Sequence, residues 1–79
     1  MDNLEKYKAA FKEAFEISDE VITDELAYES IPEWDSVGHM RLMANLEDAF
    51  DIMLETEDIL DFASFGEGKK ILAKYDVTI

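Results

Sequence analysis

The residues most able to do chemistry lie together in one stretch, Trp34-Asp35-Ser36-Val37-Gly38-His39-Met40, where a polar connection leads into an amphipathic segment. Pro32 disfavours helical geometry at the residue before it, so a helix is predicted to begin only after it, with Asp35 as N-cap. Ser36 then occupies the first helical position with an exposed hydroxyl. A modifying enzyme could reach such a serine, and a phosphate ester formed there would lie near free backbone N–H groups.

His39 is the only histidine and follows Ser36 by three residues on the same predicted helix. A hydrolytic triad needs a base beside its nucleophile, and this spacing lets His39 approach Ser36 one turn away. The angular position of His39, however, leans toward the core, and a small helical bundle offers no evident oxyanion hole. We therefore expect His39 to pack or to make a local hydrogen bond, and we expect the chain not to be an enzyme.

The length of the chain limits what it can build. Its 79 residues are predicted to form one domain, 1–79, and a domain of this size buries only about 60% of its unfolded surface. There is no room for a deep catalytic cavity beside a sufficient core. The hydrophobic fraction of 48% nevertheless separates the sequence from a disordered acidic tail.

The charge balance is strongly acidic, with 20 acidic against 7 basic residues and a net charge of −13. Nucleic-acid binding depends on Lys and Arg that neutralise phosphates, so nucleic acid is not expected as a partner. An anionic membrane surface is disfavoured for the same reason. Partners with basic patches are favoured, although excess charge could also serve only solubility.

The absence of cysteine excludes a disulfide framework and a cysteine nucleophile. If the protein handles thioesters, a bound group must supply the thiol. No apolar run approaches the ~20 residues of a membrane span and no signal-peptide core is present, so a cytoplasmic location is expected. The acidic connection 18–35 lacks the glycine that an EF-hand loop requires, and no metal site is expected there.

Periodicity and capping signals predict an all-α four-helix bundle with three longer helices and one short third helix. The predicted caps and capping boxes are Asp2 with Glu5, Asp35, Thr56 before a short helix Glu57–Phe62, and Ser64 with Glu67. The positions expected to face the core are Leu4, Tyr7, Phe11, Ala14 and Phe15, then Leu42, Met43, Leu46, Ala49, Phe50 and Met53, then Ile59, Leu60 and Phe62, and finally Phe65, Ile71, Leu72 and Tyr75.

The connection 18–35 is longer than two antiparallel neighbours need, so it is expected to be functional or to carry structure of its own. One helical turn around Asp24–Ala27 is predicted within it. Its apolar residues, expected to pin it across the bundle, are Val21, Ile22, Leu26 and Ile31. Trp34, the only tryptophan, is expected to pack over the end of the bundle and hold the connection in place.

A second face of the helix that begins at Ser36 mixes apolar and charged residues, which is unusual for a surface that only meets water. Its members are Val37, Met40, Arg41, Ala44, Glu47 and Asp48. We predict a partner-docking face, with apolar contact from Val37, Met40 and Ala44, and with Glu47 and Asp48 meeting Arg or Lys on partners. Alternatively, Val37 and Met40 pack under the 18–35 connection or against the short third helix.

The sequence as a whole resembles the acyl carrier protein family over nearly its full length. The residues that carry the resemblance are Asp35-Ser36-Val37, Leu42, Leu46-Glu47, Phe50-Asp51-Ile52, Asp58-Ile59-Leu60-Asp61 and Ser64-Phe65. The resemblance implies a bundle of acyl-carrier type in which a phosphopantetheinyl transferase attaches 4′-phosphopantetheine from coenzyme A to Ser36, with Asp35 helping that enzyme to bind its metal and the serine. Val37 replaces the usual leucine, which is a conservative change. Arg41 stands where fatty-acid carriers commonly have an acidic residue, and this departure bears on the partner set more than on the modification.

The function implied by the resemblance is that of a monomeric carrier. It would hold acyl or aminoacyl intermediates as thioesters and deliver them between a loading ligase and downstream acyl-transfer enzymes with basic docking patches, in fatty acid biosynthesis or a related pathway. One alternative within the family is an aminoacyl or peptidyl carrier loaded by an adenylate-forming ligase. Outside the family, an unmodified acidic helical adaptor that binds basic proteins remains open, as does a carboxylate metal buffer.

Overall fold

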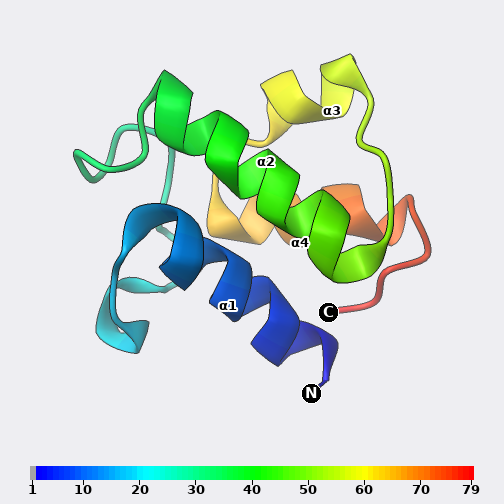
Figure 1. The fold of residues 1–79 in the computed structure, drawn as a ribbon, viewed down its shortest axis with the longest axis horizontal. Helices are drawn as coiled ribbons and strands as arrows, with labels where there is room; N and C mark the ends of the chain where they lie inside the picture. The colour runs from blue at the N-terminus through cyan, green and yellow to red at the C-terminus, as the bar shows by residue number, and fades with distance from the viewer. Residues whose placement is uncertain (1) are drawn as a thin grey trace.

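The computed structural model describes residues 2–79, which fold into four α-helices and one short 3₁₀ turn, without a β-strand in that range. The elements are α1 (Asn3–Phe15), η1 (Asp19–Val21), α2 (Ser36–Phe50), α3 (Thr56–Asp61) and α4 (Phe65–Ala73). In Figure 1, α1 and α2 lie side by side and run in opposite directions, α4 lies behind them and short α3 covers one end. The prediction of a small all-α bundle with a short third helix is confirmed.

Three of the four helix starts follow the predicted caps. The side chains of Asp2, Asp35 and Ser64 accept hydrogen bonds from the backbone N–H groups of Glu5, Gly38 and Glu67, at 2.8, 2.8 and 3.0 Å. Each bond satisfies one of the N–H groups that a first helical turn leaves without an intrahelical acceptor. Local sequence therefore determines where α1, α2 and α4 begin.

The predicted cap of α3 is wrong. Thr56 is the first helical residue, and the N-cap position is held by Glu55, whose side chain makes no capping bond. The backbone N–H of Glu55 instead donates to the hydroxyl of Tyr75, 3.0 Å away. A tertiary contact rather than a local cap fixes the start of α3.

The core is built around aromatic rings from all parts of the chain. The largest fully buried side chains are Trp34, Tyr7, Phe11, Phe15, Phe62, Leu42, Met43, Leu46 and Leu72. Phe11 makes edge-to-face contacts with Tyr7, Phe15 and Trp34 at centroid distances of 4.9 to 5.9 Å. Such pairs add to the free energy gained by burial alone, so the stripe predicted on α1 is the centre of the fold.

Four apolar residues predicted to be buried are exposed instead: Leu4, Val21, Met53 and Leu60. Met53 is 82% exposed because α2 ends at Phe50, where Asp51 takes a left-handed conformation (φ 52°) and breaks the helical phase. Leu60 is 77% exposed because six-residue α3 turns its Ile59 side toward the core and its Leu60 side outward. Leu4 and Val21 lie near the ends of their elements, at the edge of the packed surface.

The 18–35 connection contains the 3₁₀ turn η1, and near the predicted helical turn at 24–27 it makes a single hydrogen-bonded turn and no helix, with the N–H of Leu26 donating to Thr23 O at 3.0 Å. The backbone there pairs with the connection between α3 and α4: the N–H of Phe65 donates to Leu26 O at 2.7 Å, and Ala27 forms an isolated bridge with Ser64. The carbonyl oxygen of Leu26 thus bonds a distant segment, and the turn does not extend into a helix. Ile22 and Leu26 are buried and pin the connection, as predicted.

Asp58 of α3 is a buried carboxylate that sequence periodicity did not identify. It is 5% exposed and accepts hydrogen bonds from the ammonium of Lys74 and the hydroxyl of Tyr75, just beyond α4. The hydrogen bonds that Lys74 and Tyr75 donate to Asp58, that of Lys74 first, hold the pKa of Asp58 below its ordinary value. The same bonds raise the pKa of Lys74 and of Tyr75. This cluster fastens α3 to the end of the last helix.

The lowered pKa of Asp58 predicts that the stabilisation from its bonds to Lys74 and Tyr75 is lost in acid. Its contribution to the free energy of unfolding is fully present above the unfolded carboxyl pKa of about 3.9 and is lost as pH falls through the lower folded pKa. Asp58→Asn should therefore reduce the urea midpoint at pH 7, and the difference from wild type should shrink in acid. A difference that stays constant into strong acid would contradict this assignment.

Candidate functional site

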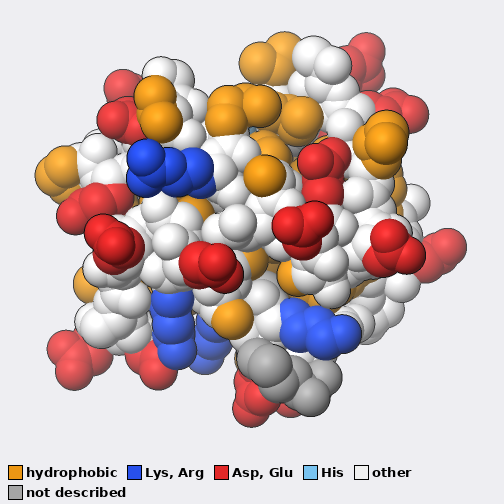
Figure 2. Space-filling view, viewed as in Figure 1, with side chains coloured by type: hydrophobic (Ala, Val, Ile, Leu, Met, Phe, Trp, Pro, Cys, Tyr) orange, Lys and Arg blue, Asp and Glu red, His pale blue; other side chains and the backbone are white. Residues whose placement is uncertain are grey.

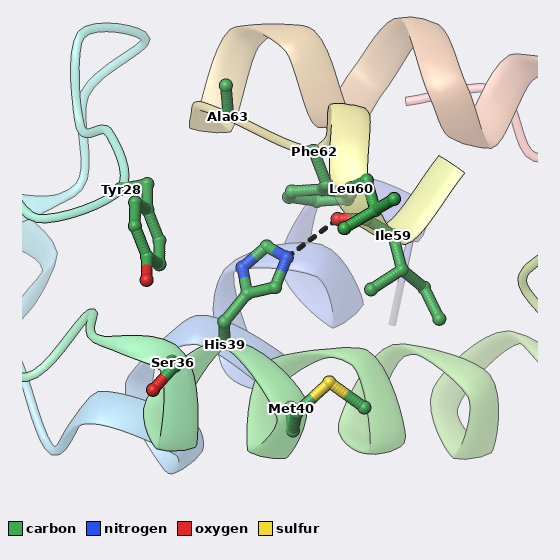
Figure 3. A pocket seen from close by; sticks show the side chains of 8 residues that line it. All are labelled: Tyr28, Ser36, His39, Met40, Ile59, Leu60, Phe62 and Ala63. Atoms are coloured by element: carbon green, nitrogen blue, oxygen red, sulfur yellow. Dashed lines mark hydrogen bonds between the residues drawn. The ribbon is translucent and has the colours of Figure 1, made fainter. Parts of the chain in front are cut away.

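Ser36 lies beside a mostly apolar groove of about 420 Å³ between α2 and α3 (Figure 3). The groove is lined by Ser36, His39 and Met40 from α2, Ile59 and Leu60 from α3, Phe62 and Ala63 from the connection that follows, and Tyr28 from the 18–35 connection. A groove of this size and lining can hold a small apolar group.

The hydroxyl of Ser36 is exposed at the first residue of α2, as predicted. Asp35, also exposed, precedes it and uses one carboxylate oxygen to accept the N–H of Gly38. Gly38 matters for a reason that the sequence did not reveal: a Cβ there would lie 2.0 Å from the carbonyl oxygen of Glu33. The incoming chain therefore packs directly on the first turn of α2, and this contact fixes where Ser36 emerges.

His39 uses both of its ring nitrogens within the protein. The indole N–H of Trp34 donates to His39 Nδ1 at 2.9 Å, and because an indole nitrogen only donates, Nδ1 must be the acceptor. The proton then sits on Nε2, which lies 2.7 Å from the carbonyl oxygen of Ile59 and donates to it. The expectation that His39 packs or makes a local hydrogen bond is confirmed by its contacts with Trp34, while its second bond reaches Ile59, 20 residues away. Neither nitrogen is free to take a proton from Ser36.

Trp34 is fully buried beneath this histidine. Its ring stacks on His39 at an interplanar angle of 18° and also packs against Phe15 and Phe11. Trp34, His39 and Ile59 thereby form a chain of contacts from the core to α3. The predicted role of Trp34 in holding the connection agrees with this position, since Trp34 O also accepts the N–H of Glu29 at 2.8 Å.

The six residues of the predicted docking face do not share one environment. Val37, Arg41, Ala44 and Asp48 are exposed and follow one another at helical spacing, and we call this line the α2 ridge. Met40 is 56% exposed and lies on the groove side of the helix. Glu47 is half-buried, and its carboxylate accepts the N–H of Leu54 at 2.9 Å, so it stabilises the turn after α2.

Charge and apolar surface are distributed unevenly around the site. Figure 2 shows hydrophobic side chains gathered where α2 and α3 meet, with acidic side chains spread over the rest of that face. Arg41 is the only cationic residue of α2. Four of the six lysines form ion pairs with carboxylates. Arg41 forms none within residues 2–79.

Two further properties bear on what the site can bind. In the described part of the chain, no three His, Asp or Glu side chains gather closely enough to hold a metal ion. None of the helices within residues 2–79 has the length and apolar character needed to cross a membrane.

Comparison of the chain with protein-family models, curated proteins and solved structures found no match in any of the three. The assignment of a function therefore depends on the motif around Ser36 and on the geometry of the groove beside it.

Proposed function

We propose that this chain is a carrier protein that holds acyl or aminoacyl groups as thioesters on 4′-phosphopantetheine attached to Ser36. The observation that supports it best is an exposed serine hydroxyl at the first residue of α2, beside an apolar groove. When attached, the prosthetic group supplies the thiol that the cysteine-free chain lacks. The proteins that would act on this chain are a phosphopantetheinyl transferase, a loading ligase and downstream acyl-transfer enzymes.

The residues around Ser36 fit a phosphodiester at this position. The first-turn N–H groups of α2 and the positive end of its dipole favour an anion there. Asp35 opposes this with its own negative charge, but its hydrogen bond to Gly38 N ties the carboxylate to the helix. The family resemblance gives Asp35 a second role, in holding the metal of the transferase during attachment.

The groove lining favours an apolar acyl cargo over an aminoacyl one. Met40, Leu60 and Phe62 present hydrocarbon, and both nitrogens of His39 are already bonded. A charged ammonium in the groove would lose hydration, and no carboxylate lines the groove to pair with it. An aminoacyl carrier loaded by an adenylate-forming ligase remains the alternative within the family, with its cargo held outside the groove.

The decisive experiment is incubation of the purified chain with coenzyme A and a broad-specificity phosphopantetheinyl transferase, followed by intact-mass measurement. The expected result is a gain of one phosphopantetheinyl group, mapped to Ser36 by peptide fragmentation. The adaptor alternative predicts an unchanged mass. An unchanged mass, or modification of another side chain, would refute the proposed function.

Asp48 gives the cleanest test of docking through the α2 ridge, because Glu47 also stabilises the turn after α2. Asp48→Lys should slow association with the transferase several-fold at low salt, and the difference from wild type should disappear at high salt. Glu20→Lys on η1 changes the charge equally, away from α2, and is the matched control. Equal association rates for the two variants, measured by stopped flow, would argue against the ridge.

A further inference from the structure

The hydroxyl of Tyr28 differs from the other two tyrosine hydroxyls of the chain. Tyr7 donates to the carbonyl oxygen of Phe65 at 2.6 Å, and Tyr75 donates to Asp58 at 2.5 Å. Both of these serve the fold. The hydroxyl of Tyr28 makes no hydrogen bond to any atom of residues 2–79, although it belongs to the lining of the groove beside Ser36.

The position of Tyr28 is nevertheless well fixed. Its backbone N–H donates to the carbonyl oxygen of Ala63 at 2.9 Å, which ties it to the connection between α3 and α4. Its ring meets His39 edge to face, with the centroids 5.6 Å apart and an interplanar angle of 82°. Tyr28 as a whole is 39% exposed, so the structure holds it at the mouth of the groove and leaves part of it open to solvent.

The free hydroxyl points toward the end of α2 that bears Ser36 (Figure 3). The charges nearest in sequence to Ser36 are Glu33 and Asp35, both exposed carboxylates. An anion attached to Ser36 would therefore need hydrogen-bond donors that do not come from charged side chains of that segment. A phenol O–H is such a donor, and its bond to a charged phosphate oxygen is stronger than a bond between neutral groups.

We propose that Tyr28 is a positioning residue for the prosthetic group: its hydroxyl donates a hydrogen bond to the phosphodiester carried by Ser36 and directs the arm along the groove. The inference depends on the proposed function, since it requires a phosphodiester at Ser36. Apart from the hydroxyl of Ser36, which would be esterified, the hydroxyl of Tyr28 is the one side-chain donor of the groove lining that makes no hydrogen bond within residues 2–79.

The test compares the wild type with Tyr28→Phe and Tyr75→Phe after each has been converted to the phosphopantetheinylated form and verified by intact mass. Tyr28→Phe keeps the ring that packs on His39 and removes only the hydroxyl. The phosphorus-31 NMR signal of the phosphodiester is expected to change its chemical shift and to narrow in Tyr28→Phe, because the phosphate loses a donor and moves more freely. The urea midpoint of this variant is expected to match that of the wild type.

Tyr75→Phe removes a hydroxyl that bonds Asp58 and does not line the groove. It is expected to lower the urea midpoint and to leave the phosphorus signal as in the wild type. An unchanged phosphorus signal in Tyr28→Phe would overturn the inference, and so would an equal change in both variants, which would indicate general loosening. If the wild-type chain gains no mass, the proposed function fails, and this inference fails with it. If the chain is modified but the phosphorus signal of Tyr28→Phe is unchanged, only this inference fails.

Discussion

Ser36→Ala is expected to abolish the transfer of phosphopantetheine to the chain while leaving the helical bundle intact. The hydroxyl oxygen is the atom to which the group would be attached, and alanine has no replacement for it. Helix α2 should survive because its capping bond comes from Asp35 and not from Ser36. Intact mass should show no modified species for this variant, and far-UV circular dichroism should match the wild type.

Ser64→Ala is the matched control, because Ser64 also lies at the start of a helix but serves as its cap. It should retain full modification and lose about 1 kcal/mol of stability with the bond to Glu67 N. Modification that persists in Ser36→Ala, or that disappears in Ser64→Ala while the fold remains intact, would contradict the assignment of the attachment site.

Trp34→Ala is expected to have the largest effect on stability. The side chain is fully buried and packs against rings from α1, α2 and the segment after α3. Removing a buried aromatic side chain costs about 3–5 kcal/mol, and a core in a domain of this size rarely supplies more than about that amount. Much of the variant should therefore be unfolded at 25 °C. Circular dichroism would measure this in a urea titration, with a stabilising osmolyte added to obtain the folded baseline.

Trp34→Phe is an intermediate case, because it removes the hydrogen bond and only part of the packed volume. Phenylalanine keeps an aromatic ring but leaves His39 Nδ1 without its donor, which should cost about 1–3 kcal/mol. We expect the urea midpoints in the order wild type, Trp34→Phe, Trp34→Ala. A Trp34→Ala variant with the wild-type midpoint would show that the buried ring contributes little.

The parts of this fold that were predictable from sequence are those determined by near neighbours. Asp2, Asp35 and Ser64 cap helices through bonds to residues three positions on, and the aromatic stripe of α1 follows from helical spacing. The exposed hydroxyl of Ser36 was predictable for the same reason, since the cap at Asp35 places Ser36 at the first helical position. The core assignment failed where an element was short or ended early, as at Leu60 and Met53.

The parts that were not predictable depend on residues far apart in the chain. The burial of Asp58 was not predicted, because its partner Lys74 lies 16 positions away in the chain. Hydrogen bonding by His39 was predictable, but its partners were not, because one of them is the backbone carbonyl of Ile59, on another helix. The free hydroxyl of Tyr28 becomes notable only when the groove and the bonded states of the other tyrosines are known.

The chain of contacts from Trp34 through His39 to Ile59 has a practical consequence. The molecule contains one indole, that of Trp34, and the imidazole of His39 links it by hydrogen bonds to the backbone of α3. Displacement of α3 by cargo or by a docked enzyme would therefore alter the surroundings of the only strong ultraviolet fluorophore. Its emission can follow loading and release in real time without any attached dye.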